Sequence, residues 1–158
     1  MDEEFLTAER QAKLSESYHR LGEALEACVA KKGRNAALES QLPFSLDDAR
    51  FPVLRELGES ERRAKEVHEK MVNSYRGVRR RKQEAEMAYR GEQASEVDLR
   101  RVDAEFVIAF EAMLKTGHRH VEAMEAHENM RSQLLESVCQ QLERRGSPQK
   151  NLLPEVLD

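Results

Sequence analysis

The sequence predicts an all-α protein, an elongated antiparallel three-helix coiled-coil bundle that we expect to be dimeric. Charged residues make up 35% of the 158-residue chain and aromatic residues only 5%, with no tryptophan. The four prolines leave two long proline-free windows rich in good helix formers. An apolar content of 39% is low for a compact core, but it suffices for helices that each bury a single stripe.

Apolar residues at alternating spacings of four and three predict the first helix. They are Leu14, Tyr18, Leu21, Leu25 and Cys28, the pattern of a helix with one apolar seam. We expect this helix to run from near Asp2 to about Lys32, because Gly33 can end it. Pro43 breaks the segment that follows, and Ser45 with Asp48 matches the capping signature of a new helix.

The second helix is predicted from near Phe51 to Gly91. Its apolar seam consists of Val53, Leu57, Ala64, Val67, Met71, Tyr75, Val78, Ala85 and Tyr89. Ser95 and Asp98 repeat the capping signature, which places a short turn at about residues 91–94. A turn that short makes the second and third helices antiparallel neighbours.

The third helix is the longest that the sequence predicts, and the Gly-Ser-Pro run at residues 146–148 stops it. Its seam consists of Leu99, Val102, Phe106, Phe110, Met113, Gly117, Val121, Met124, Glu128, Arg131, Leu135, Val138 and Leu142. At 1.5 Å per residue the second and third helices would span roughly 60 and 75 Å.

Residues 1–146 are therefore predicted to form one helical coiled-coil domain, followed by a tail over residues 147–158. Small or polar members interrupt the seams, which support an isolated monomer only weakly, so we expect a homodimer. Whether its two chains run parallel or antiparallel stays open. The residues predicted for the bundle or dimer seam are Leu21, Leu25, Val67, Met71, Val78, Phe106, Phe110, Met113, Val121, Leu135, Val138 and Leu142.

No catalytic, cofactor-binding or metal-binding motif emerges from the sequence. It holds no GxSxG, no glycine-rich phosphate loop and no CxxC pair, so we expect no enzyme, no cofactor and no small-molecule substrate. Cys28 and Cys139 are expected to be reduced thiols that pack like small apolar side chains. His118, His120 and His127 lie near three glutamates (122, 125 and 128), but their spacing completes no ligand set on one helix face, and no metal site is predicted.

A basic run in the second helix is the candidate binding site. Six bases stand between Tyr75 and Gly91 in a chain of net charge −4: Arg76, Arg79, Arg80, Arg81, Lys82 and Arg90. If Tyr75, Val78 and Tyr89 face inward, Arg76 and Arg80 lie opposite them. Lys82 falls within the seam, and we expect its stem to cover apolar surface while its charged end extends out to solvent. Four interpretations remain: a solvated helix face, a surface for anionic lipid or an acidic protein, a nucleic-acid contact, and a nuclear address label.

Three stretches of the chain resemble the BAR superfamily, whose members form curved antiparallel helical dimers. They are YHRLGEALEACV, VNSYRGVRRRKQEAEMAY and SQLLESVCQQLERRG, and the resemblance lies in helix lengths and charges over most of residues 1–146. It implies dimerisation through all three helices and basic residues near the helix tips against anionic membrane. The acidic N-terminus does not resemble the basic insertion helix of some members, so membrane contact would rest on the basic face alone.

The sequence thus predicts a non-enzymatic scaffold that homodimerises and docks on acidic membrane through its basic run. The alternative is a coiled-coil adaptor, cytoskeletal or concerned with assembly, that binds a helical protein partner and no lipid. We expect no nucleic-acid partner, because the chain is acidic overall and carries no recognition motif. The N-terminus has no apolar segment of the kind found in signal peptides, which predicts a cytoplasmic protein that can associate peripherally with membrane.

Overall fold

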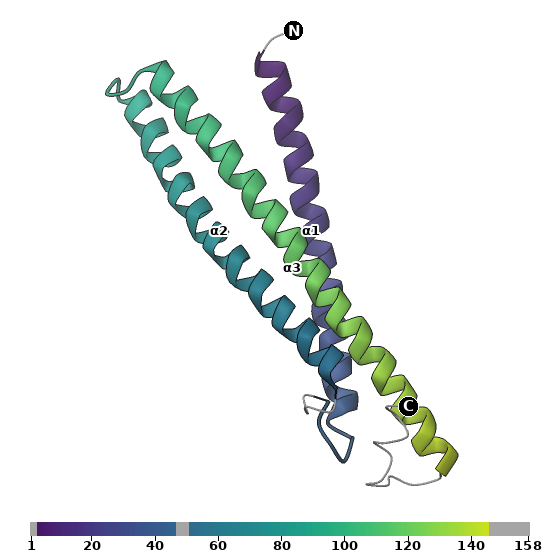
Figure 1. Cartoon of the computed structure of the whole chain (residues 1–158). Coiled ribbons are helices and arrows are strands. Elements are labelled where there is room, and N and C mark those ends of the chain that lie inside the picture. The colour runs from purple at the N-terminus through teal and green to yellow at the C-terminus, as the bar shows by residue number, and fades with distance from the viewer. Residues whose placement is uncertain (1–2, 47–50, 146–158) are drawn as a thin grey trace. The chain divides into compact units, whose positions relative to one another are not determined.

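The computed structural model describes residues 3–46 and 51–145, with side chains over residues 8–46 and 51–144. It contains helices α1 (Glu3–Glu39), α2 (Pro52–Arg90) and α3 (Glu96–Arg145), and the described residues form no strand (Figure 1). The all-α prediction is confirmed. Over the described residues, no helix is both long enough and apolar enough to cross a membrane. The predicted tail, residues 147–158, lies outside the described part of the chain.

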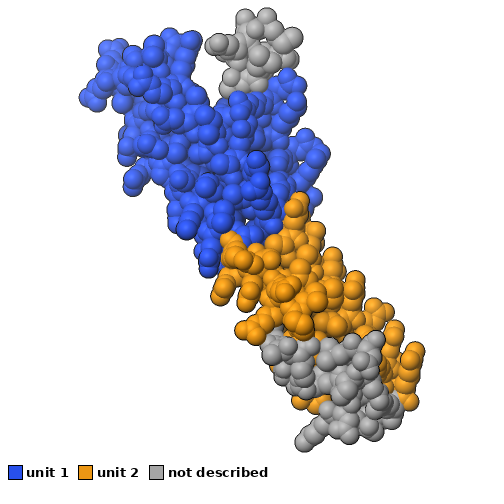
Figure 2. Space-filling view, viewed as in Figure 1, with its two compact units in different colours: residues 1–23, 64–120 blue, residues 24–63, 121–158 orange. Residues whose placement is uncertain are grey.

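The helices divide into two compact units, coloured separately in Figure 2. Unit 1 comprises residues 1–23 and 64–120, and unit 2 comprises residues 24–63 and 121–158. Each unit therefore contains a segment of all three helices and has an interior of its own.

Aromatic rings from all three helices pack together in unit 1. The Tyr75 ring of α2 lies 5.5 Å from that of Phe106 and 5.4 Å from that of Phe110 on α3, measured between centroids. Tyr18 of α1 joins them at 6.0 Å from Phe110. Tilted ring pairs at these separations add about 0.5–1.5 kcal/mol each to the stabilisation from burial alone. Aromatic packing therefore connects the three helices in this unit.

Contacts along α2 and α3 show that these helices run in opposite directions in unit 1. Lys82 of α2 lies 3.7 Å from Asp103 near the start of α3. His68, which comes earlier in α2, contacts Thr116, which comes later in α3. In this unit α1 and α3 run in the same direction, because Arg10 pairs with Glu111 at 2.6 Å and Ser17, further along α1, lies 3.0 Å from His118, further along α3. The dimeric coiled coil predicted from the sequence involves a second copy and stays a prediction.

Gly117 permits the closest approach between helices in unit 1. A Cβ added there would lie 2.6 Å from Leu21 Cδ2 of α1 and 3.0 Å from His68 Cε1 of α2. Both distances are shorter than ordinary van der Waals contacts, so a side chain at this position would force two neighbours to move. Gly117 therefore serves the packing because it has no side chain, and not because its backbone is flexible.

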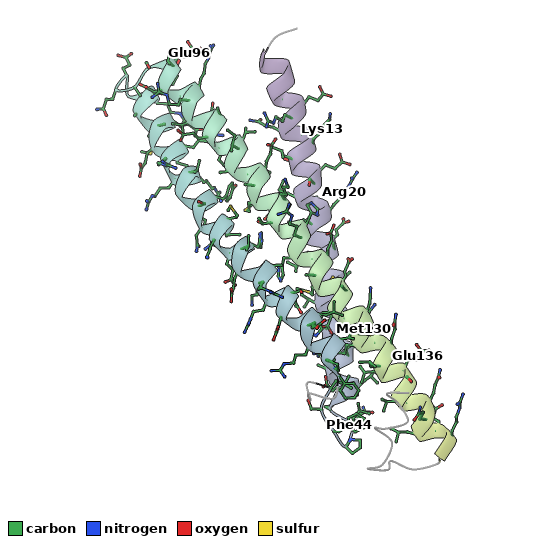
Figure 3. The ribbon with its side chains drawn as sticks, viewed as in Figure 1. Lys13, Arg20, Phe44, Glu96, Met130 and Glu136 are labelled. Carbon is green, nitrogen blue, oxygen red and sulfur yellow. The ribbon has the colours of Figure 1, made fainter. Side chains whose placement is uncertain are left out.

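Unit 2 has an apolar core formed partly by the segment between α1 and α2. Leu46, Phe51, Leu54 and Leu135 are at most 3% exposed and form one cluster. Leu42, Phe44, Met130 and Leu134 pack against it, and Figure 3 labels Phe44 and Met130. The Leu46 backbone N–H donates to Glu39 Oε1 at 2.9 Å, which fastens this segment to the end of α1.

The sequence-based end of the first helix at Lys32 is wrong, because α1 continues through Gly33 to Glu39. A Cβ at Gly33 would meet nothing within 4 Å, and the backbone there does not enter the left-handed region that ends helices. Beyond it, Asn35 is buried and donates hydrogen bonds to α3. Tertiary contact therefore offsets the helix propensity that glycine loses, about 1 kcal/mol.

Local signals correctly predicted the connection between α2 and α3. The N–H groups of Glu92 and Gln93 donate to the carbonyls of Tyr89 and Ala88, with Glu92 in the left-handed region at φ 60°. This is the Schellman arrangement, although the left-handed residue is Glu92 and not Gly91. Ser95 then caps α3: the Asp98 N–H donates to Ser95 Oγ, and the Ser95 N–H and O–H donate to the Asp98 carboxylate. The cap predicted at Ser45 and Asp48 extends outside the described residues.

The predicted seam residues divide into three groups by exposure. Buried members are Leu21, Val78, Met113, Val121, Leu135 and Val138. Half-buried members are Met71, Phe106, Phe110 and Leu142. Leu25 and Val67 are 39% and 47% exposed, so in the single chain they lie outside the core. Tyr89 is 44% exposed, which corrects the expectation that its ring faces inward.

Replacing Gly117 with alanine should lower the free energy of unfolding by about 1 kcal/mol, because overpacking of about 1–3 kcal/mol exceeds the gain in helix propensity. Urea unfolding followed by circular dichroism measures the difference. Gly22→Ala is the matched control, since a Cβ there meets nothing within 4 Å, and it should stabilise the chain by up to about 1 kcal/mol. Equal stabilisation by both substitutions would contradict the packing described for Gly117.

Candidate functional site

The first of two candidate sites is a cluster of three buried polar side chains in unit 2. We name it the Glu61–His127–Glu128 cluster. His127 Nδ1 of α3 donates a hydrogen bond to Glu61 Oε2 of α2 at 2.6 Å and lies 3.6 Å from Glu128 Oε2. Glu61 and His127 are 8% exposed and Glu128 is fully buried. Burial of this many ionisable groups requires compensating partners.

Two bases partly neutralise the carboxylates of the cluster. Lys32 Nζ of α1 lies 3.3 Å from Glu61 Oε1, and Arg131 Nε lies 3.8 Å from Glu128 Oε1. Arg131 also pairs with Glu39 Oε2 at 3.3 Å, which adds a third carboxylate to the surroundings. The cluster therefore lies in a network of alternating charges contributed by all three helices.

Asn35 connects α1 to the cluster through hydrogen bonds. Its Nδ2 donates to the Glu128 backbone carbonyl at 3.0 Å and to Glu128 Oε1 at 3.2 Å. Its Oδ1 accepts from Ser132 Oγ at 3.0 Å. A buried asparagine that uses both ends of its amide in this way holds the helices at one register, since a shift along either axis would break all three bonds.

Opposing effects act on the Glu61 carboxyl. Burial works to raise its pKa, but the hydrogen bonds and charges of His127 and Lys32 outweigh burial, and the pKa lies below its usual value. Gly58 leaves room beside the imidazole, because a Cβ there would be 3.4 Å from His127 Nε2. The chain thus holds Glu61 as a carboxylate next to His127.

The three histidines considered from the sequence separate in the structure. His118 Nε2 lies 3.0 Å from Ser17 Oγ, and His120 stacks on His68 with ring centroids 6.1 Å apart. His127 is brought to two carboxylates, those of Glu61 and Glu128. In unit 1, burial lowers the pKa of His68, whose Nδ1 lies 3.1 Å from Thr116 Oγ1.

The spacing of residues along a single helix does not reveal Glu61 as a member of the cluster, because Glu61 comes from α2 and the other two residues from α3. A signal was present in the seam of that helix. Glu61 follows Leu57 by four residues and precedes Ala64 by three, so a charged residue occupies an apolar seam position. A carboxylate at a seam position indicates a buried partner on the facing helix.

Cys28 does not have the surroundings of a reactive thiol. Burial raises the pKa of Cys28, and Glu125 raises it further through its charge and a hydrogen bond. Cys28 is buried, Cys139 is half-buried, and both are free thiols. At neutral pH the Cys28 sulfur therefore stays protonated, which agrees with the packing role expected for it.

The second candidate site is the basic face of unit 1, which we define as Arg76, Arg79, Arg80 and Arg81 of α2. All four arginines are exposed. Lys82, the next residue, was expected to extend its charged end out to solvent. Instead its Nζ lies 4.2 Å from the centre of the Phe106 ring and 3.7 Å from Asp103 Oδ1. Arg90 is exposed in the last turn of α2.

The basic face differs from several other bases on the helix surfaces because those bases have acidic partners. Several bases pair with a glutamate four residues away, including Lys13 with Glu9 and Arg20 with Glu16, and Figure 3 labels both bases on α1. Arg55, Lys65 and Arg100 form similar pairs. Among the described residues, no carboxylate lies within 4.0 Å of the guanidinium groups of the basic face. These four charges are available to a partner.

No protein-family model matches the chain, and comparisons with curated proteins and with solved structures also find no match. The resemblance to the BAR superfamily therefore stays a prediction from the sequence.

Asn35→Ala should lower the free energy of unfolding by about 1–3 kcal/mol, because Glu128 and Ser132 would lose buried hydrogen-bond partners. Urea titration measures this loss. Asn129→Ala is the control: Asn129 is exposed and bonds Lys31 at the surface of the same unit, and its removal should change stability by under about 0.5 kcal/mol. Equal effects of the two substitutions would show that the network contributes nothing.

Proposed function

We propose that the chain is a non-enzymatic helical scaffold that homodimerises and docks on acidic membrane through the basic face. The observation that carries the proposal is the set of four exposed, unpaired arginines within one turn and a half of α2. Each base near an anionic bilayer surface contributes about 1 kcal/mol of attraction. Several such bases on one rigid helix add up to reversible binding that salt weakens, since the Debye length is only about 10 Å at 0.1 M ionic strength.

The position of Lys82 supports a docking role over a purely solvated helix face. Its contacts with Phe106 and Asp103 anchor α2 on α3 directly beside the arginines. The arginines are thereby presented from a packed element instead of a loop. Rigid presentation lowers the ordering cost of binding a surface.

A groove in unit 1 supports the homodimer. It lies between α2 and α3, has a volume of about 390 Å³ and is lined by Met71, Ser74, Val78, Arg81, Glu105, Ile108, Ala109 and Ala112. Ile108 is 63% exposed there. Because Arg81 and Glu105 both line the groove, two-fold pairing of identical copies would bring each Arg81 to a glutamate of the other copy while covering Ile108. Arg76, Arg79 and Arg80 of the basic face would then serve the membrane. This self-complementarity favours a second copy of the chain as the occupant of the groove.

The membrane proposal is tested by sedimentation with vesicles. The wild-type protein should sediment with phosphatidylserine-containing vesicles at low salt and not with pure phosphatidylcholine vesicles, and binding should fall as salt rises. Reversing Arg76, Arg79 and Arg80 to glutamate should abolish sedimentation, because repulsion replaces attraction at three points.

A matched variant separates this face from overall charge. Reversing Arg62, Arg63 and Lys65, exposed bases elsewhere on α2, changes the net charge equally and should leave most of the binding intact. Light scattering on the wild-type protein without vesicles should report about twice the chain mass of 18.2 kDa. Failure of the wild type to sediment would refute the membrane proposal and favour the adaptor that binds a helical protein, and a monomeric mass would refute the dimer.

A further inference from the structure

The Glu61–His127–Glu128 cluster has a donor set and a charge balance that the proposed docking function does not use. One ligand atom from each residue lies within 4.8 Å of the other two. The atoms come from neighbouring helices, Glu61 from α2 and the other two from α3. All three residues belong to unit 2, so the arrangement rests on the packing of a single unit.

An unused acceptor points into the space between these atoms. Glu128 Oε2 is buried and has no hydrogen-bond partner among the described residues, although Oε1 of the same carboxylate accepts from Asn35. His127 Nδ1 lies 3.6 Å from this oxygen, too far for a hydrogen bond. A fully buried carboxylate oxygen without a donor is costly, and a cation removes that cost.

The charges around the cluster favour a cation as well. The cluster and its neighbours contain three carboxylates, those of Glu39, Glu61 and Glu128. Two bases, Lys32 and Arg131, pair with these carboxylates. With a neutral imidazole these five described side chains carry one net negative charge, which a positive ion between Glu61 and Glu128 would offset.

The donor set identifies the class of ion. One imidazole nitrogen with two carboxylate oxygens suits divalent first-row transition ions such as Zn²⁺, whereas Mg²⁺ and Ca²⁺ prefer oxygen alone. Around a tetrahedral ion with bonds of about 2.0–2.2 Å, ligand atoms stand about 3.4 Å apart. His127 Nδ1 lies 2.6 and 3.6 Å from the two carboxylate oxygens, which straddle that value.

We propose that Glu61, His127 and Glu128 form a structural binding site for a divalent transition-metal ion. On binding, the neutral imidazole carries its proton on Nε2 instead of Nδ1, so that the Nδ1 lone pair binds the ion in place of the hydrogen bond to Glu61. The ion also provides the missing partner of Glu128 Oε2. By binding groups on two helices it fixes α2 against α3 in unit 2. The site is independent of the basic face in unit 1.

Equilibrium dialysis of the metal-depleted full chain against Zn²⁺ tests the proposal. We expect one zinc ion per chain and a rise in the temperature of unfolding on binding. Glu128→Gln should weaken zinc binding at least about tenfold, by analogy with losses of 10–100-fold when groups around a metal are removed. The same variant keeps the shape and the bond to Asn35, so without metal it should unfold at the same or a higher temperature than the wild type.

Glu128→Gln should thus weaken zinc binding without lowering the unfolding temperature of the metal-free chain. This combination distinguishes a metal site from a purely structural ion network. His127→Gln should also lose zinc binding, whereas Glu122→Gln and His19→Gln, which change exposed residues of the same types, should bind zinc as the wild type does. Absence of zinc binding by the wild type would overturn the proposal. Unchanged affinity in Glu128→Gln would overturn it also.

Discussion

A buried hydrogen bond of 2.6 Å between His127 Nδ1 and Glu61 Oε2 determines how α2 lies against α3 in unit 2. Apolar side chains alone specify register weakly, since a leucine packs acceptably against several neighbours. A buried carboxylate has no such freedom, because a slip of one residue would leave it without a partner at a cost of about 1–3 kcal/mol. Asn35 applies the same constraint to α1, and the apolar cluster around Leu54 and Leu135 then packs at the register that these polar contacts select.

Charge has two different roles in this chain. In unit 2 it is buried, paired and contributed by three helices, so it specifies packing. In unit 1 the arginines of the basic face are exposed and unpaired, whereas Lys82 beside them is fixed on Phe106. Packing in unit 1 depends instead on the rings of Tyr75, Phe106 and Phe110 and on the missing side chain at Gly117. The charges that specify the fold are therefore separate from those that are free to bind.

Features with local causes were predictable from the sequence. The capping bonds of Ser95 and Asp98 and the turn after α2 depend on residues a few positions apart. The end of α1 was not predictable, because Asn35 sustains the helix past Gly33 through contacts with α3. Glu61 was missed for the same reason: its partner is 66 residues away. Exposure of Leu25 and Val67 likewise depends on where neighbouring helices lie, which seam spacing alone does not specify.

A double-mutant cycle on Glu61 and His127 tests the register account most directly. Glu61→Leu and His127→Leu should each lower the free energy of unfolding by about 1–3 kcal/mol in metal-free buffer, since each leaves a buried polar partner unsatisfied. The double variant replaces both groups with apolar ones and should recover much of the loss, giving a coupling energy of about 1–3 kcal/mol. Additive losses, with a coupling energy under about 0.5 kcal/mol, would contradict the claim that this contact sets the register of α2 and α3.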